Sequence, residues 1–246
     1  MPNEPNVAME FVGQEVHQES PMGCGGSKTK PALSAFDQRV SESLRKFKEQ
    51  YDKVKKGHIN SFDQVILKFP KIHNAFQEVK KLFNSCDDDG NGTLDYGEIK
   101  PIMEKLGTQT MTDEEISTVF NEADMYQNNQ LTHKEFMVCL ALGYVLGDIK
   151  VENSEGLGGE VKQAFDDVLG AYFIFDVDGG GTLDKEEVMR QMQSKEGAFK
   201  SASAASVLTK ERWAEMDWDH DGNISFKEFF WAFQKWIGSE DGTDED

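Results

Sequence analysis

Apolar residues recur every three or four positions along much of this chain, a period that predicts amphipathic helices. Pro70 suits the first turn of a helix. After it the apolar positions keep helical spacing: Ile72, Phe76, Val79, Leu82 and Phe83. Further along, Thr112 and Glu115 have the spacing of a capping box, and Met111 is placed to pack over the helix start. We therefore expect an all-α fold.

One helix–loop–helix plan occurs four times, each time with a polar loop that begins with Asp and ends with Glu. The loops are DDDGNGTLDYGE (87–98), DMYQNNQLTHKE (124–135), DVDGGGTLDKEE (176–187) and DWDHDGNISFKE (217–228). Their spacing predicts two pairs of units, 62–147 and 160–238, joined by a Gly-rich linker at 148–159. We expect the segments 1–32 and 239–246 to be disordered, the second because it is strongly acidic.

The first and fourth loops have the spacing of an EF-hand calcium site. Ca²⁺ takes six to eight oxygens, which such a loop supplies from positions 1, 3, 5, 7, 9 and 12, with glycine at position 6 where the chain turns. Around Gly92 the candidate ligands are Asp87, Asp89, Asn91, Thr93, Asp95 and Glu98. Around Gly222 they are Asp217, Asp219, Asp221, Asn223, Ser225 and Glu228. We expect calcium in both loops.

The third loop departs from this pattern at position 5, where Gly180 offers no side chain and a water could take the vacant place. The candidate ligands that remain are Asp176, Asp178, Thr182, Asp184 and Glu187. Calcium binding is expected here too, with lower affinity.

The second loop departs further, because Tyr126 replaces the acid at position 3 and Asn129 replaces the turn glycine. Asn tolerates the left-handed conformation, so the turn remains feasible. The oxygens available are those of Asp124, Asn128, Gln130 and Glu135. We favour a structural unit that stays empty. The sequence thus predicts three bound Ca²⁺, with a fourth as the open alternative.

Every loop keeps an aliphatic residue at position 8, where paired loops meet on a short strand: Leu94, Leu131, Leu183 and Ile224. The second loop keeps this residue although it has lost ligands. This favours a scaffold role, in which it holds the first loop in shape.

From about Phe62 onward the chain resembles the calmodulin superfamily, and most of all the four-hand plant calmodulin-like proteins. The resemblance rests on the four loops, on FDQVILKFPKI (62–72) before the first loop, and on WDHDGNISFKEFFWAFQKWIG (218–238) at the last. It implies a two-lobed helical fold, Ca²⁺ as ligand and no catalytic activity. Some members of this superfamily carry acylation signals at the N-terminus.

The segment 33–58 combines the helical period with a basic surface. Its apolar residues are Leu33, Phe36, Val40, Leu44, Phe47, Tyr51 and Val54, and its bases are Arg39, Arg45, Lys46, Lys48, Lys53, Lys55 and Lys56. Calmodulin-type grooves bind helices of this kind, and anionic membranes attract them. Three interpretations stay open: a plain helix packed on the first lobe, a switchable internal ligand, and a membrane contact.

The net charge of −19 excludes nucleic acid as a natural partner and favours cations and basic peptides. No catalytic motif occurs, and the carboxylates are accounted for by metal ligation, so we expect no catalytic residues and no enzyme activity. Three cysteines, Cys24, Cys86 and Cys139, form no disulfide framework and favour a reducing compartment. The expected location is the cytoplasm.

The predicted function is that of a Ca²⁺ sensor or adaptor that exposes apolar surface and binds a target, such as a basic amphipathic helix of a kinase or phosphatase. Trp231 and Trp236 are expected to contact something beyond their own lobe. The alternatives are a Ca²⁺ buffer and a structural subunit of a cytoskeletal or flagellar assembly.

Near the N-terminus, Met22, Gly23 and Cys24 read as an acylation signal that lies inside the chain. If translation started at Met22, Gly23 could be myristoylated and Cys24 palmitoylated, and the protein would associate with membranes. For the chain as printed we expect a soluble protein.

Overall fold

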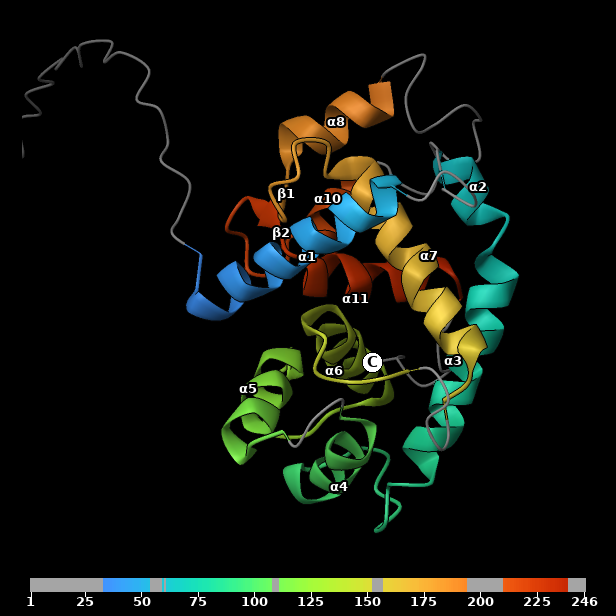
Figure 1. Cartoon of the computed structure of the whole chain (residues 1–246), viewed down its shortest axis with the longest axis vertical. Coiled ribbons are helices and arrows are strands. Elements are labelled where there is room, and N and C mark those ends of the chain that lie inside the picture. The colour runs from blue at the N-terminus through green and yellow to red at the C-terminus, as the bar shows by residue number, and fades with distance from the viewer. Residues whose placement is uncertain are drawn as a thin grey trace, which may run out of the picture. The chain divides into compact units, whose positions relative to one another are not determined.

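The computed structural model describes residues 33–53, 59, 61–107, 111–151, 157–193 and 210–238. Its helices are α1 (Ala35–Lys53), α2 (Phe62–Ile66), α3 (Phe69–Asn84), α4 (Tyr96–Leu106), α5 (Asp113–Ala123), α6 (His133–Leu146), α7 (Gly159–Phe175), α8 (Lys185–Gln193), α10 (Lys210–Met216) and α11 (Phe226–Trp236). Two short strands, β1 (Leu183–Asp184) and β2 (Asn223–Ile224), complete the described elements (Figure 1). The predicted all-α architecture is confirmed.

Four helix–loop–helix units follow one another, and we call them hands 1 to 4: α3–α4, α5–α6, α7–α8 and α10–α11. The expected capping box is present at the start of α5, where the Thr112 side chain accepts from Glu115 N and Met111 is buried. Pro70 lies in the first turn of α3, where its missing N–H leaves no hydrogen bond unmade.

The hands pair through the aliphatic residues at loop position 8. Leu94 and Leu131 exchange two backbone hydrogen bonds of 2.8 Å between hands 1 and 2. Leu183 pairs with Ile224 across the antiparallel strands β1 and β2. All four side chains are fully buried. The predicted pairing of hands 1+2 and 3+4 into two lobes is confirmed.

The two lobes share one hydrophobic core. Helices α3 and α7, from different lobes, run side by side (Figure 1). The Phe76 ring of α3 lies 6.3 Å from Phe165 of α7 and 5.8 Å from Phe230 of α11. Each lobe has an apolar face, and packing the two faces together removes both from water.

The predicted linker at 148–159 also contributes to this core. Ile149 forms an antiparallel bridge with Gly107 of the first lobe, and its side chain is buried together with those of Val151 and Leu157. The described ends of the linker therefore pack on the protein and do not hang free between the lobes.

Helix α1 packs against both lobes. Its buried face, with Phe36, Val40 and Leu44, lies on the shared core, and α6 of the first lobe is the helix that it contacts most. Beyond this face, the Phe47 ring lies 5.7 Å from Tyr144 of α6, and the Tyr51 ring lies 5.7 Å from Phe173 of α7. The amphipathic period of the segment thus reflects packing on the protein itself.

Because the core is shared, we expect the two lobes to unfold together. Replacing Phe76 with Ala should lower the free energy of unfolding by about 3–5 kcal/mol, since it leaves a cavity between the lobes. Urea denaturation followed by circular dichroism and by tryptophan emission should give one coincident transition. The control is Leu67→Ala, because Leu67 is 81% exposed and should matter by less than about 0.5 kcal/mol. Separate transitions for the lobes would contradict the shared core.

Candidate calcium sites

The first loop brings its acidic side chains together at one point. Carboxylate oxygens of Asp87, Asp89 and Glu98 lie within 4.8 Å of one another. The Asp87 carboxylate accepts from the backbone N–H of Asn91 at 3.1 Å and of Gly92 at 2.9 Å, which wraps the chain around that point. Gly92 has a φ of +83°, a conformation that glycine adopts without strain.

The glutamate that ends each loop also lies in the first turn of the exit helix. Glu98 is the third residue of α4, where one carboxylate oxygen accepts from Asp95 N at 3.0 Å and the other from Asp88 N at 2.8 Å. Glu135 and Glu228 complete capping boxes at α6 and α11 in the same way. The side chain that would close an ion site therefore ties the two ends of the loop together.

The third loop is the most enclosed of the three acidic sites. Asp176 is fully buried, and its Oδ2 has no hydrogen-bond partner among the described residues. Oxygens of Asp176, Asp178 and Glu187 lie within 4.8 Å of one another. Gly180 offers no side chain, as the sequence showed, and its N–H donates to Asp178 Oδ1 at 2.7 Å.

Helix α1 closes over this third loop, a contact that no local sequence pattern indicates. Lys48 Nζ donates to the backbone oxygens of Asp176 at 2.5 Å and Phe173 at 3.3 Å. Ser41 Oγ donates to the Gly181 carbonyl at 3.3 Å. A helical period shows which face of α1 is buried, but the loop that receives it depends on how the lobes pack.

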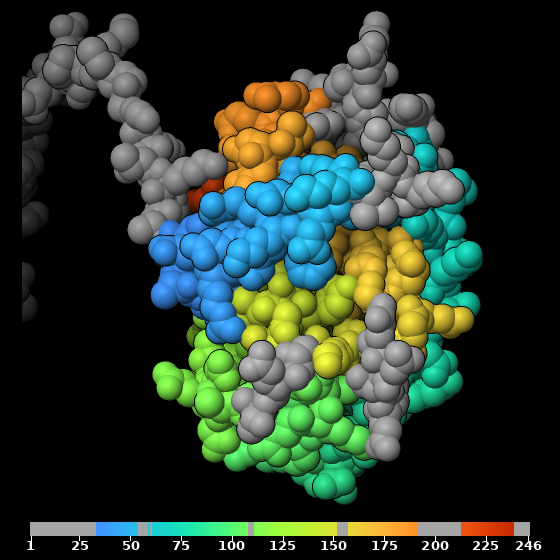
Figure 2. Space-filling model, in the orientation of Figure 1, coloured from blue at the N-terminus to red at the C-terminus, as the bar shows by residue number. Residues whose placement is uncertain are grey.

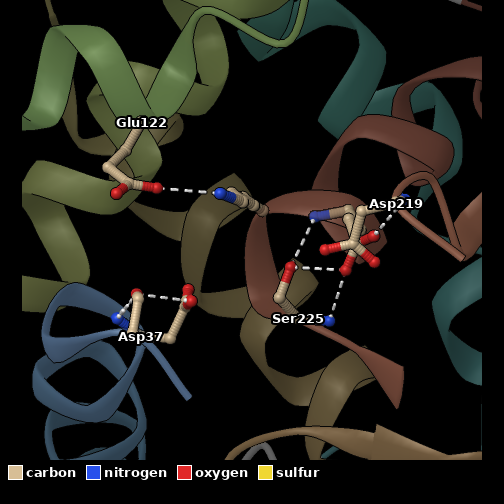
Figure 3. Close-up of polar contacts among 7 residues, drawn as sticks. Asp37, Glu122, Asp219 and Ser225 are labelled. Atoms are coloured by element: carbon tan, nitrogen blue, oxygen red, sulfur yellow. Dashed lines mark hydrogen bonds and ion pairs between the residues drawn. The ribbon is translucent and has the colours of Figure 1, made fainter. Parts of the chain in front are cut away.

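In the fourth loop the carboxylates of Asp217, Asp219 and Asp221 lie within 4.8 Å of one another. Glu228 reaches back across the same loop, and its Oε1 accepts from Trp218 N at 2.9 Å and Asp219 N at 3.4 Å. Its Oε2 accepts from Ser225 Oγ at 2.6 Å (Figure 3). This loop thus has the hydrogen-bond plan of the first.

The second loop keeps the shape of the others without their charge. Asp124 accepts from Asn128 N and Asn129 N, and Asn129 makes the turn with a φ of +61°. The Tyr126 side chain is 52% exposed and packs against Trp218. Within the described residues, the groups of three or more potential ligand side chains lie in the other three loops.

Burial makes the charged state of several of these carboxylates costly. It raises the pKa of Asp176, Glu187 and Glu228, although Lys48 acts against it at Asp176 and hydrogen bonds act against it at the two glutamates. A divalent cation would offset this cost. The donors are oxygens only, which suits the hard ion Ca²⁺ better than a soft transition metal. The residues of loops 1, 3 and 4 therefore fit calcium.

These loops define the class of the protein: it is a calcium-binding EF-hand protein. The sequence model of the family described as an EF-hand domain pair matches residues 76–138. The chain belongs to the calmodulin-like calcium-binding proteins of this class.

Two relatives from Arabidopsis thaliana carry this assignment. The chain is 30% identical to probable calcium-binding protein CML21, over 74% of this chain and 78% of the relative. It is 29% identical to probable calcium-binding protein CML22, over 90% of this chain and 96% of the relative. It is also 30% identical to calcium-dependent protein kinase 10 of the same plant, but this match covers only 28% of the kinase.

No described helix is both long enough and apolar enough to cross a bilayer. The predicted acylation residues Gly23 and Cys24 lie outside the described residues.

The close approach of α1 to the third loop yields a comparison of two equivalent glycines. Gly181 and Gly222 occupy position 6 of loops 3 and 4, with φ of +79° and +87°. A Cβ at Gly222 meets nothing within 4 Å, so Gly222→Ala should cost about 1 kcal/mol of backbone strain. A Cβ at Gly181 would lie 2.7 Å from Ser41 Cα, so Gly181→Ala should cost about 1–3 kcal/mol more. Urea unfolding in chelator measures both, and equal losses would contradict the contact.

Proposed function

We propose that loops 1, 3 and 4 bind Ca²⁺ and that loop 2 is a structural element without an ion. Three acidic side chains converge in each of loops 1, 3 and 4, and this supports the assignment. In loop 2 Asp124 and Glu135 are the only acidic residues, and both are buried. Tyr126 removes the third acid that the other loops have. Asn128 and Gln130 supply neutral oxygens alone.

Titration calorimetry on the metal-free chain should give three Ca²⁺ per chain. Glu98→Gln, Glu187→Gln and Glu228→Gln should each remove one ion, because each takes away the charge that closes its loop. The matched control is Glu135→Gln in loop 2, which should leave the number of ions unchanged. Four ions in the wild type, with one lost in the control, would show that loop 2 binds.

We propose further that the protein is a Ca²⁺ sensor that binds a target protein. The observation that carries this proposal is the shared core, in which the apolar faces of both lobes lie against each other. The described part of the chain exposes few large apolar side chains: Leu67, Tyr126, Val177 and Trp218. If ion binding separates the helices of a hand, the buried faces become a surface for an apolar partner. A buffer needs no apolar surface that ion binding can expose.

Helix α1 supports this interpretation as an internal occupant of the apolar surface. Figure 2 shows it between α8 on one side and α6 with α7 on the other. It is held near the third loop by Lys48 and at the start of the linker by Arg39, whose guanidinium lies 2.9 Å from Asp148. A target helix of similar basic and amphipathic character could displace it, and the net charge of −19 would favour such a target.

The kinase relatives suggest the class of target. Calcium-dependent protein kinases of Arabidopsis thaliana and Oryza sativa contain a segment similar to this chain. This chain would regulate a separate enzyme, such as a kinase or phosphatase, in the cytoplasm and without catalysis of its own.

A hydrophobic resin tests the sensor against its alternatives. We expect the full chain to be retained in Ca²⁺ and released by chelator, because the ion exposes apolar surface. Binding of an apolar fluorescent dye should rise in parallel. The triple variant Glu98→Gln, Glu187→Gln, Glu228→Gln should behave alike in both conditions. If the wild type also behaves alike in both, it is a buffer or a permanent subunit.

A further inference from the structure

Hand 2 docks on hand 4 of the other lobe. Glu122, in the last turn of α5, forms an ion pair with Lys227, whose Nζ lies 2.8 Å from the Glu122 carboxylate (Figure 3). Gln234 of α11 donates to the Lys134 carbonyl at 3.2 Å. These contacts join units that belong to different calcium-loop pairs, so they are not part of the pairing through β1 and β2.

Tyr126 adds an aromatic contact at the same interface. Its ring lies 5.7 Å from both Trp218 and Trp231, and those two rings are 6.2 Å apart. Such edge-on aromatic pairs contribute about 0.5–1.5 kcal/mol beyond the area that they bury. Tyr126 occupies the loop position at which the other loops have an acidic ligand. The residue that deprives loop 2 of an acid is therefore the one that contacts loop 4.

The partners on hand 4 are chain neighbours of the fourth loop's carboxylates. Trp218 stands between Asp217 and Asp219, and Lys227 directly precedes Glu228. The Lys227 side chain is 23% exposed. Glu122 of α5, Asp37 of α1 and Glu228 all place negative charge near its ammonium group. A shift of either contact residue would therefore displace a candidate ligand.

From these contacts we propose that Glu122 and Tyr126 are positioning residues for the fourth calcium site, and that hand 2 is its docking partner. The inference rests on the proposed calcium binding of loop 4. The aromatic contact holds Trp218, and with it Asp217 and Asp219, in the arrangement where their carboxylates converge. Glu122 holds the Lys227 ammonium away from those carboxylates, where it would compete with Ca²⁺.

Each of loops 1, 3 and 4 contains its own reporter. The N–H of the glycine at position 6 donates to the first aspartate of its loop: Gly92 to Asp87 at 2.9 Å, Gly181 to Asp176 at 3.4 Å and Gly222 to Asp217 at 3.3 Å. Calcium binding at that aspartate changes the amide resonance of the glycine. A Ca²⁺ titration of the ¹⁵N-labelled full chain therefore follows the three loops separately in one sample.

Glu122→Gln should weaken binding at loop 4, read from Gly222, by about two- to fivefold, as expected for a partly exposed ion pair. The midpoint of the Ca²⁺ titration read from Gly92 should not change. The charge-matched control is Glu78→Gln, which breaks the exposed pair between Glu78 and Lys81 on α3 and should leave Gly222 unchanged. Tyr126→Ala should also weaken Ca²⁺ binding at loop 4, read from Gly222, and should shift the tryptophan emission. Tyr126→Phe keeps the ring, so its Gly222 titration and its emission should match those of the wild type.

The outcomes separate the two proposals. If Gly222 in the wild type does not respond to Ca²⁺, the proposed function of loop 4 is wrong. If Gly222 responds with the same midpoint in wild type, Glu122→Gln and Tyr126→Ala, calcium binds but the positioning role is overturned. Equal weakening at Gly92 and Gly222 would likewise overturn it, because a general loss of stability affects all loops.

Discussion

The two lobes bury their apolar faces against each other, and this contact organises the described part of the molecule. Paired hands have an apolar side that must leave water, and here each lobe supplies the cover for the other. The aromatic contacts of Phe62 in α2 with Phe175 and Trp236 in the second lobe belong to the same arrangement. Because the lobes are in contact, one helix, α1, reaches both of them. A partner that needs these faces must compete with the protein's own contacts.

Within this arrangement the closing glutamates couple local structure to chemistry. Each joins the start of an exit helix to the opposite end of its loop through backbone N–H groups, as Glu228 does between Ser225 and Trp218. An ion that takes the same oxygens acts on the helix start directly. Hand 2 keeps this plan with Glu135 but presents an aromatic side chain where an acid would stand. A hand can therefore lose its ligands and still act as a packing element.

The four hands follow from the sequence alone, because loop ligands, turn residues and capping boxes are local patterns. It also predicted their pairing, through the aliphatic residue at position 8. For Trp231 and Trp236 it predicted contacts beyond their own lobe, and these are confirmed by Tyr126 and Phe62. The ligand assignments stay predictions, since they require bound ions to test.

Which surfaces meet depends on how the whole lobes pack. That Lys48 lies on the third loop, that Glu122 pairs with Lys227 and that Tyr126 meets Trp218 depends on residues about a hundred positions apart. A helical period states that a face is buried, but the same period is compatible with many partners. The partner of each face is determined by how well whole faces pack together. This fit is a property of the packed lobes and cannot be read from any short stretch of sequence.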